Sequence, residues 1–332
     1  MNLPSRVSLA RLPTPLEPLD RLSASLPTGH RLWVKRDDLT DAAISGNKLR
    51  KLEFVAAAAR EQGCDTLITC GGVQSNHCRA TALVGARLGF RVHLILRGDA
   101  PTEADGNLLL DHMAGARVSH YPRERYINEL DDLFDEWRQV YAAEGSRALC
   151  IPTGASDGIG LWGYVNGAVE LLSDMAEHQI GEAHWLCATG SGGTQAGLTL
   201  GAAAAGAPVT VWGVNVCDDE AWFLNKVAGD IEDGRRRYPD ALDWPEVSPR
   251  VIDGYVGPGY GHAEAPVFET IARVARLEGL VLDPVYTGKA FHGMLAEIGE
   301  GRFGDSGDLI FVHTGGIFGV FPQRSQFEFL RR

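Results

Sequence analysis

The sequence lacks any hydrophobic stretch long enough to cross a bilayer. Charged and glycine residues interrupt every apolar run well before the roughly 20 residues that a membrane-spanning helix needs. The first six residues, up to Arg6, contain no apolar core of the kind found in a secretory signal peptide. We therefore expect a cytoplasmic protein without a membrane partner.

Positive charge is also scarce. The chain of 332 residues has 31 Lys and Arg against 43 Asp and Glu, which gives a formal net charge of -12. A protein that binds nucleic acid or an anionic membrane needs a basic face. The one basic run, residues 235–237, has acidic neighbours and no interleaved aromatics, as is typical of a solvated face. We expect no nucleic acid among the partners.

The cysteine pattern argues against disulfides and metals. None of the six cysteines forms a CxxC pair or stands at a metal-ligand spacing with histidine. We interpret them as reduced and mostly buried thiols, and we expect no metal site. Internal repeats and low-complexity tracts are absent as well, which leaves an ordinary globular chain with 45% hydrophobic residues.

What the sequence does contain is an alternation of strand-like and helical patterns. The strand-like runs are residues 31–36, 66–70, 92–96, 118–121, 148–151, 184–188, 209–216, 280–282 and 309–313, and the helical patterns include 108–112, 127–143 and 165–176. This alternation predicts an α/β fold with two open, twisted, mostly parallel sheets flanked by helices. We expect a large cofactor-binding domain from residues 1–47 and 160–332. A small α/β domain would comprise residues 48–159.

A short glycine-containing loop opens a helical pattern at residues 45–51. Asn47 can cap this helix, which would fix the direction in which Lys48 leaves the loop. Lys48 and Lys51 are three residues apart and share a helix face, so one anionic ligand could meet both. Alone, however, a lysine in a first helical turn is more often a solvated charge than a catalytic group.

A second glycine-rich loop makes a catalytic role for Lys48 more plausible than the spacing of the lysines alone does. It follows a strand and opens a helix, where backbone N–H groups and the helix dipole stabilise a phosphate. The loop consists of Gly190, Ser191, Gly192, Gly193 and Thr194. It is neither a Walker A motif nor a clean GxGxxG pattern, and the alternative is a tight turn that needs small residues. Together, the lysine and this anion loop indicate a Lys Schiff base with pyridoxal 5'-phosphate.

Residues 72–77 repeat the strand-turn-helix setting. Ser75, Asn76 and His77 come at the start of a helix, a place that can hold a carboxylate. The alternative is that Ser75 or Asn76 simply caps the helix. His77 alone is more often a satisfied supporting histidine than an acid or base.

Taken together, these motifs allow a family to be named. The chain resembles the D-cysteine desulfhydrase and 1-aminocyclopropane-1-carboxylate (ACC) deaminase family of pyridoxal-phosphate enzymes, which have the tryptophan-synthase-β-like fold. The resemblance runs nearly end to end through the segments LPTPLEPLDRLS, VKRDDLT, SGNKLRKLEF, GGVQSNHCRATA, ATGSGGTQAGL, GPGYG, LEGLVLDPVYTGKAFHGM and FVHTGG. Several of these together are highly specific to the family.

The resemblance implies a role for each residue of the cofactor site. Lys48 would form the Schiff base, with Asn47 beside it also counted as cofactor-binding. Lys51 and the loop at residues 190–194 would hold the phosphate. Asn76 would bond the phenolic oxygen of the cofactor, and Ser75 with neighbouring backbone amides would receive the substrate carboxylate.

The resemblance also places residues on the substrate side. Tyr260 and Tyr286 would stand near the substrate side chain. Thr287 would meet the pyridine nitrogen, and Thr314 follows the late histidine. The deaminase type typically has Glu and Leu at these two positions, so the threonines favour the desulfhydrase.

Three departures from the desulfhydrase pattern fall on residues 154–163, on Ala80 and on residues 317–319. We expect them to line the substrate side.

The implied reaction is β-elimination from a small amino acid, with D-cysteine giving pyruvate, sulfide and ammonia. The alternatives within the same chemistry are ACC deamination, sulfite elimination from cysteate, and amino-acid racemisation. An alternative of a different class is a non-catalytic protein that binds a phosphate ligand in the anion loop. The resemblance further implies a homodimer.

Overall fold

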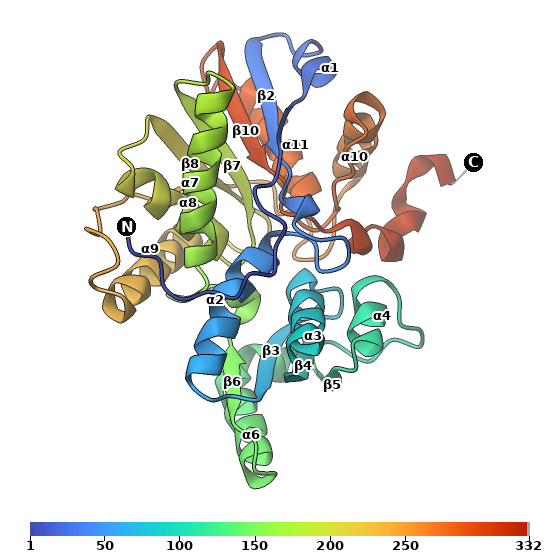
Figure 1. The fold of residues 1–332 in the computed structure, drawn as a ribbon. Coiled ribbons are helices and arrows are strands. Elements are labelled where there is room, and N and C mark those ends of the chain that lie inside the picture. The colour runs from blue at the N-terminus through green and yellow to red at the C-terminus, as the bar shows by residue number, and fades with distance from the viewer. Residues whose placement is uncertain (331–332) are drawn as a thin grey trace.

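Ten strands form two separate sheets in the part of the chain that the computed structural model describes, residues 1–330 (Figure 1). The larger sheet has the strand order β1-β2-β10-β7-β8-β9, and the smaller has the order β5-β4-β3-β6. The strands are β1 Leu16–Pro18, β2 Gly29–Lys35, β3 Thr66–Gly72, β4 Arg91–Arg97, β5 Arg117–Tyr121, β6 Ala148–Ile151, β7 Ala183–Thr189, β8 Val209–Asn215, β9 Arg250–Ile252 and β10 Ser306–Val312. All neighbours pair in parallel except β1, which is antiparallel to β2. The predicted fold class is therefore confirmed.

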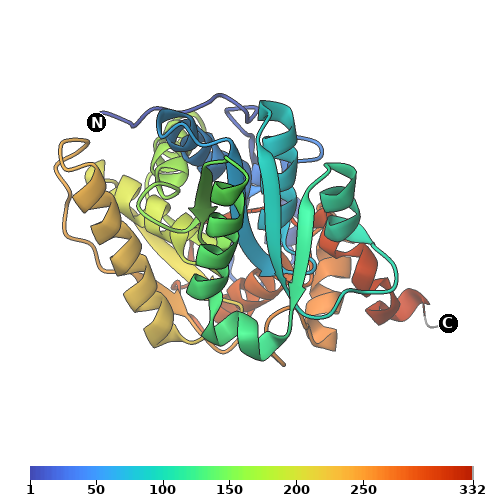
Figure 2. The same cartoon turned by 90° about the horizontal axis from the view of Figure 1, so that it is seen from below.

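Helices connect the parallel strands and cover the sheets. They are α1 Asp20–Ser23, α2 Asn47–Glu61, α3 Asn76–Leu88, α4 Gly106–Met113, α5 Arg123–Asn128, α6 Leu130–Ala143, α7 Trp162–Glu177, α8 Gly193–Ala204, α9 Glu220–Arg237, α10 Ala265–Glu278 and α11 Thr287–Gly299. Short 3-10 turns lie at Asp37–Leu39, Thr153–Ala155, Ile317–Gly319, Phe321–Gln326 and Glu328–Leu330. The N-terminal segment and the C-terminal turns lie on opposite sides of the molecule (Figure 2). No helix among residues 1–330 is both long enough and apolar enough to span a membrane.

Both faces of the larger sheet are buried, which explains why its strands are continuously apolar. On β7, Trp185 and Cys187 face α7 and α8, whereas Leu186 and Ala188 face α1, α10 and α11. In the smaller sheet, α5 and α6 cover one face, and α3 and α4 pack on the other. This arrangement leaves the strand ends as the place where a site can form.

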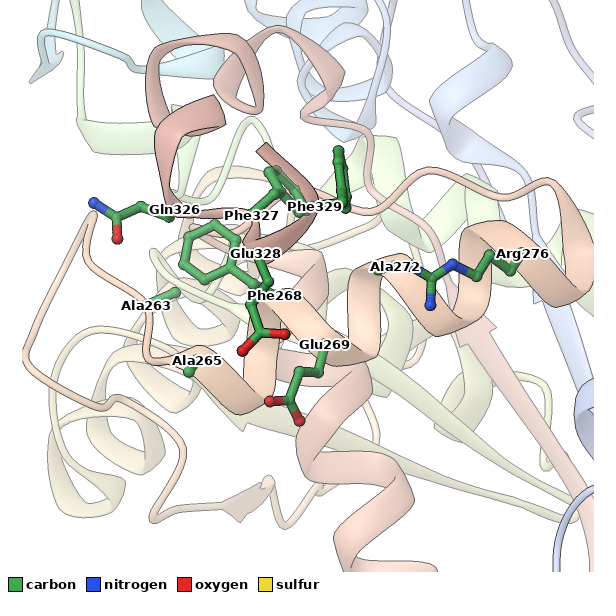
Figure 3. A pocket seen from close by; sticks show the side chains of 10 residues that line it. All are labelled: Ala263, Ala265, Phe268, Glu269, Ala272, Arg276, Gln326, Phe327, Glu328 and Phe329. Atoms are coloured by element: carbon green, nitrogen blue, oxygen red, sulfur yellow. The ribbon is translucent and has the colours of Figure 1, made fainter. Parts of the chain in front are cut away.

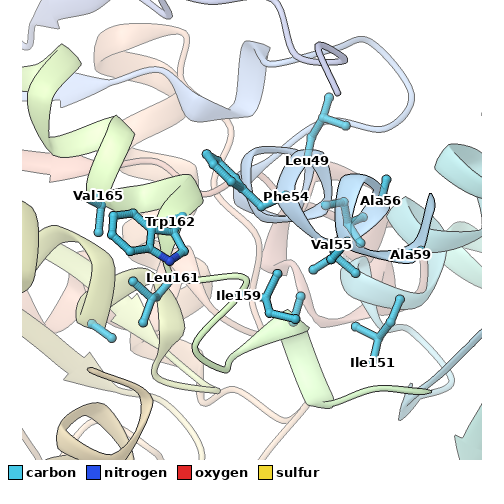
Figure 4. Packing of buried hydrophobic residues seen from close by; sticks show 14 of the residues in the cluster. Leu49, Phe54, Val55, Ala56, Ala59, Ile151, Ile159, Leu161, Trp162 and Val165 are labelled. Atoms are coloured by element: carbon cyan, nitrogen blue, oxygen red, sulfur yellow. The ribbon is translucent and has the colours of Figure 1, made fainter. Parts of the chain in front are cut away.

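Helix α2 joins the two sheets. Leu49 and Phe54 share one buried cluster with Trp162 and Val165 of α7 (Figure 4). The same cluster includes Leu67 of β3 and residues of α3, so α2 packs against elements of both sheets. Lys48 therefore stands at the start of the element that the two halves have in common.

Three local predictions need correction. Residues 280–282 form no strand. His313 Nε2 lies 3.1 Å from the carbonyl oxygen of Val281, and the backbone N–H of Asp283 donates to a side chain at 2.8 Å. Side chains, and not a neighbouring strand, therefore bond the backbone here. The helix predicted over 127–143 is two helices, because the backbone at Glu129 leaves the helical region with φ -127° and ψ 23°. Strand β9 was not predicted, since its three residues are too short for a pattern.

Candidate active site

A cavity of about 610 Å³ lies at the carboxyl ends of strands from both sheets. Residues at the ends of β3, β4, β6, β7, β8 and β10, or just after them, line it. Open parallel sheets bind ligands at this edge because loops and helix N-termini converge there. Of the predicted site residues, eleven line the cavity: Asn47, Lys48, Ser75, Asn76, Gly190, Ser191, Gly192, Thr194, Tyr260, Tyr286 and Thr314. Lys51, Gly193 and Thr287 do not.

A smaller hollow of about 270 Å³ lies between α10 and the C-terminal turns (Figure 3). Phenylalanines 268, 327 and 329 line it together with Glu269 and Arg276. None of the predicted site residues lies there. The chemistry indicated by the sequence therefore belongs to the larger cavity.

Lys48 is the second residue of α2. Its Nζ donates a hydrogen bond to Asn47 Oδ1 at 3.0 Å. Burial, and next the positive charge of Arg79, lower the pKa of Lys48 from its ordinary value of 10.5 to about 8, with the Asp283 carboxylate opposing them. The neutral, nucleophilic amine is therefore far more populated near neutral pH than it is for a solvated lysine.

The start of α2 differs from the prediction. Asn47 does not cap the helix but is its first residue, and Gly46 occupies the N-cap position with a φ of 102°. A Cβ on Gly46 would lie 2.5 Å from the carbonyl oxygen of Thr314, so only glycine permits this close approach. Since it does not cap the helix, Asn47 is able to donate a hydrogen bond from Nδ2 to Thr194 Oγ1 at 2.9 Å.

Lys51 lies one turn further along α2 and is fully buried. Its Nζ donates hydrogen bonds to Gly154 O and to Ser156 Oγ, each at 3.1 Å. Burial, and next the charge of Lys48, hold the pKa of Lys51 well below its usual range. An anion near this nitrogen would offset both effects, so the place is prepared for negative charge.

Ser156 connects Lys51 to the anion loop. Its Oγ accepts a hydrogen bond from Gly193 N at 3.1 Å and donates one to Ser191 Oγ at 2.8 Å. A Cβ on Gly193 would lie 2.7 Å from Ser156 Oγ and 2.9 Å from Lys51 Nζ. The glycine therefore lets the loop backbone approach both side chains closely.

The anion loop itself turns from β7 into α8. Gly192 is the N-cap residue, with a φ of 86°, in the left-handed region that glycine adopts readily. The backbone N–H groups of the first turn of α8 are therefore close to Lys51, where they and the helix dipole favour an anion. The hydroxyl of Thr189, the last residue of β7, is buried without a hydrogen-bond partner within residues 1–330.

At the start of α3, the interpretation of Ser75 as a helix cap is confirmed. Ser75 is the N-cap residue, and its Oγ accepts a hydrogen bond from Cys78 N at 3.2 Å. Asn76 Oδ1 accepts a hydrogen bond from Asn107 Nδ2 at 3.0 Å, which holds the amide in place. Both residues still line the cavity, so the capped helix N-terminus faces it.

His77 also lines the cavity, and hydrogen bonds through Thr69 to Ile151 fix its ring. Thr69 Oγ1 donates to Ile151 O at 2.9 Å, so it accepts from His77 Nε2 at 2.7 Å. Burial, and next the charges of Lys48 and Lys51, hold the pKa of His77 well below its usual value. The imidazole is therefore neutral, with its hydrogen on Nε2.

Two tyrosines close the other side of the cavity. The hydroxyl oxygens of Tyr260 and Tyr286 lie 2.6 Å apart. Burial raises the pKa of Tyr260 to about 12, and it raises the pKa of Tyr286 further, helped by Tyr260. Both phenols therefore keep their protons near neutral pH. Their rings pack close to Gly72 at the end of β3 and Gly190 after β7.

The two threonines are placed differently. Thr314 lines the cavity after β10. Thr287 is fully buried, donates from Oγ1 to Asp283 Oδ1 at 2.7 Å and accepts from Asp283 N at 2.8 Å. The structure does not bring Thr287 to the cavity, because its hydroxyl is engaged with Asp283.

The expected substrate-side departures also lie elsewhere. Ala80 is buried in the cluster around α2, and neither Ile317 nor Phe318 lines the cavity. Of residues 154–163, Gly154 and Ser156 line it, beside Lys51. Ser156 thus lies in a segment that the sequence analysis expected at the substrate side, but its contact with Lys51 was not predicted.

Pyridoxal 5'-phosphate fits these residues. The buried Lys51 amine, the close approach at Gly193 and the unpartnered Thr189 hydroxyl are the groups that would hold its phosphate. The reactive amine of Lys48 faces the same cavity. Such a fold and site define a phosphate-cofactor enzyme of the α/β class that works through a lysine.

Comparison with known proteins agrees with this class. The family described as "Pyridoxal-phosphate dependent enzyme" matches residues 7–315. D-cysteine desulfhydrase from Klebsiella pneumoniae is 38% identical over 322 residues, covering 95% of each chain. The mitochondrial bifunctional D-cysteine desulfhydrase/1-aminocyclopropane-1-carboxylate deaminase from Arabidopsis thaliana is 37% identical over 335 residues, 98% of this chain and 81% of that protein.

A solved structure gives the same result. The crystal structure of an ACC deaminase homologue superposes with a TM-score of 0.88 at 34% identity, covering 98% of this chain and 96% of the other. The chain belongs to the family of pyridoxal-phosphate-dependent enzymes that includes D-cysteine desulfhydrases and ACC deaminases. Its cofactor is therefore pyridoxal 5'-phosphate.

Proposed function

We propose that this enzyme catalyses β-elimination from a small amino acid, with D-cysteine as its substrate and pyruvate, sulfide and ammonia as products. The observation that carries the proposal is the Lys48 amine. It lines a cavity with an anion cradle on one side and two protonated phenols on the other, and its pKa is lowered to about 8. The name of the Klebsiella relative supports the choice of substrate.

The chain's own residues divide the work of holding the cofactor. Lys48 would hold its reactive carbon, and Lys51, Ser156 and the loop at residues 190–194 would hold its phosphate. Asn76 would bond its phenolic oxygen. When bound, the cofactor draws electrons away from the substrate's Cα.

The substrate would be oriented by the start of α3. Ser75 and the backbone N–H groups there would receive its carboxylate. Lys48, whose lowered pKa makes it a base near neutral pH, would take the Cα proton. The thiolate would then leave from Cβ on the side of Tyr260 and Tyr286. Since one of these hydroxyls donates to the other, the second is able to donate to the thiolate.

ACC deamination is the competing activity, because both names occur among the relatives. Threonine at position 314 in place of the deaminase leucine favours the desulfhydrase, and this residue lines the cavity. Thr287 does not add support for the desulfhydrase. Its hydroxyl donates to Asp283 and is not placed to meet the pyridine nitrogen of the cofactor.

A substrate screen with the purified holoenzyme tests the proposal. Pyruvate and sulfide released from D-cysteine, with slower or no turnover of ACC, is the expected result, and Lys48→Ala is the control for background reactions. Faster deamination of ACC than desulfuration of D-cysteine would assign the other activity. Loss of optical activity without keto acid would instead indicate a racemase.

We also propose a homodimer, on the family resemblance, and a cytoplasmic location. Sedimentation velocity of the holoenzyme tests the dimer, and a monomer at micromolar concentration contradicts it. Fractionation of the source cells tests the location.

A further inference from the structure

Arg97 is an arginine of the cavity that no step of the proposed reaction uses. It is the last residue of β4, and its register partner on β3 is Gly72, three residues before Ser75. It lines the same cavity as Lys48. Its guanidinium therefore lies beside the place where the substrate would bind.

Aromatic rings hold this guanidinium in place. Its central carbon lies 4.9 Å from the ring centre of Tyr260 and 5.7 Å from that of Tyr126. Contacts of this kind orient the planar group without neutralising it. The fork of N–H donors is thus fixed while its charge stays available.

No carboxylate compensates this charge among residues 1–330. The guanidinium of Arg97 forms neither an ion pair nor a hydrogen bond there, although Asp131 and Asp218 also line the cavity. Arg50 shows the contrast, because its buried guanidinium is paired with Asp37 and Glu170. An oriented, unpaired guanidinium in a cavity is a receptor for an anion.

The cofactor phosphate is not that anion. Its proposed cradle consists of Lys51, Ser156 and the loop after β7. Arg97 belongs to the smaller sheet and contacts Tyr260, whose hydroxyl meets that of Tyr286 at 2.6 Å. Arg97 is therefore on the side assigned to the substrate side chain.

We propose that Arg97 is a specificity-determining residue that binds an anionic group carried on the Cβ of the amino-acid substrate, a sulfonate or a carboxylate. The proposal rests on the proposed function, since it takes the amino-acid part to lie between Lys48 and Ser75. Both groups present oxygens that a guanidinium fork meets with two hydrogen bonds. The enzyme's substrates then include cysteate as well as cysteine.

A sulfonate and a carboxylate on Cβ would react differently. With a sulfonate, Lys48 takes the Cα proton and the Cβ–S bond breaks, so that sulfite leaves with the electron pair of that bond. Hydrolysis of the remaining three-carbon fragment gives pyruvate and ammonia. With a carboxylate, as in aspartate, Cβ carries no leaving group, so the amino acid binds as a competitive inhibitor.

The test compares Arg97→Gln with Arg117→Gln in the holoenzyme. Arg117 is a matched control, because its guanidinium also lies over a ring, 4.4 Å from the centre of Trp137, but it does not line the cavity. Both enantiomers of cysteate and of neutral β-chloroalanine are assayed for kcat/KM. Binding of aspartate is measured by calorimetry, which needs no turnover.

We expect Arg97→Gln to lower kcat/KM for cysteate and the affinity for aspartate by at least about tenfold, with β-chloroalanine changed less than about threefold. Arg97→Lys, which keeps the charge but loses the fork, should fall between wild type and Arg97→Gln. Arg117→Gln should match wild type throughout.

Three outcomes decide the matter. Equal losses for cysteate and β-chloroalanine mean that Arg97 only shapes the cavity, and the inference is overturned. The enzyme could also turn over D-cysteine but fail to bind aspartate, or bind aspartate equally well in wild type and Arg97→Gln. Either result overturns the inference and leaves the proposed function standing. Arg97-dependent binding of aspartate without turnover of any substrate supports the inference while the proposed function fails.

Discussion

The side-chain amide of Asn47 donates a hydrogen bond to Thr194 Oγ1 at 2.9 Å, across 147 positions of sequence. The bond ties the start of the helix that carries Lys48 to the loop that would hold the cofactor phosphate. Gly46, not Asn47, occupies the N-cap position of that helix. The spacing between amine and anion cradle is thus set by the protein before any cofactor binds, which lowers the ordering cost of binding.

Replacing the two lysines should separate their roles. Lys48→Ala is expected to abolish turnover and the covalent cofactor absorbance, because it removes the cavity amine that bonds Asn47. Lys51→Gln should keep that absorbance but weaken cofactor retention at least about tenfold, since it removes a buried amine that a bound phosphate would protonate and pair with. Absorbance spectra before and after dialysis measure both. Covalent cofactor in Lys48→Ala would show that another residue is the nucleophile.

The lowered pKa of Lys48 predicts the pH dependence of cofactor attachment. Only the neutral amine reacts with an aldehyde, and its pKa is about 8 instead of 10.5. The rate at which the apoprotein takes up pyridoxal 5'-phosphate should rise with pH up to about 8 and then level off. Stopped-flow absorbance at several pH values measures it. A rate that keeps rising to about pH 10 would mean that the site does not perturb this amine.

Gly193→Ala should weaken cofactor binding by at least tenfold. The new Cβ would lie 2.7 Å from Ser156 Oγ and 2.9 Å from Lys51 Nζ, so the cradle has to open. Overpacking of this kind costs about 1–3 kcal/mol in stability as well. Equilibrium dialysis and denaturant unfolding of the apoprotein give the two quantities separately.

Gly201→Ala is the matched control for Gly193→Ala. It overpacks the same helix, with a Cβ 2.5 Å from that of Ala168, but it touches neither Lys51 nor Ser156. Its apoprotein should lose comparable stability and keep its cofactor affinity. If both variants lost affinity equally, the turn after β7 would be a packing feature and not a phosphate cradle.

Thr287→Val should destabilise the apoprotein by about 1–3 kcal/mol, because the buried Asp283 loses two hydrogen bonds to the same hydroxyl. Thr314→Val, at the cavity wall, should cost less than about 0.5 kcal/mol. Urea unfolding of the two apoproteins measures the difference. A stable Thr287→Val variant with an altered cofactor spectrum would instead place this hydroxyl at the pyridine nitrogen.

Much of the fold follows from local patterns in the sequence. Residues 66–70 and 184–188 predict strands correctly because both faces of each sheet are covered, so their apolar runs are continuous. Residues 280–282 are also apolar, and Leu280 and Leu282 are buried, but the carbonyl oxygen of Val281 meets the His313 side chain instead of a strand. Local composition reports burial and does not report pairing.

Those parts of the candidate site that consist of one short segment of sequence could be predicted. The loop after β7 and the turn after β3 each contain their small residues within a few positions of a helix start. Ser156 and Arg97 were not predictable in this way, because contacts with Lys51, 105 residues away, and with Tyr260 on another element give them their roles. The domain boundaries proposed at residues 47/48 and 159/160 remain predictions.

The position of β10 in the larger sheet has a consequence for how the protein is made. Strands β3 to β6 are consecutive in the chain, so the smaller sheet can pair as soon as residue 151 has left the ribosome. Strand β10 lies between β2 and β7, so β2 gains its parallel partner only after residues 306–312 have been synthesised. During synthesis the nascent chain therefore carries β2 unpaired on that edge for 270 residues, from its end at Lys35 to the start of β10 at Ser306. An exposed apolar edge of this kind is what chaperones bind, and slower translation of the last 30 residues would prolong that exposure.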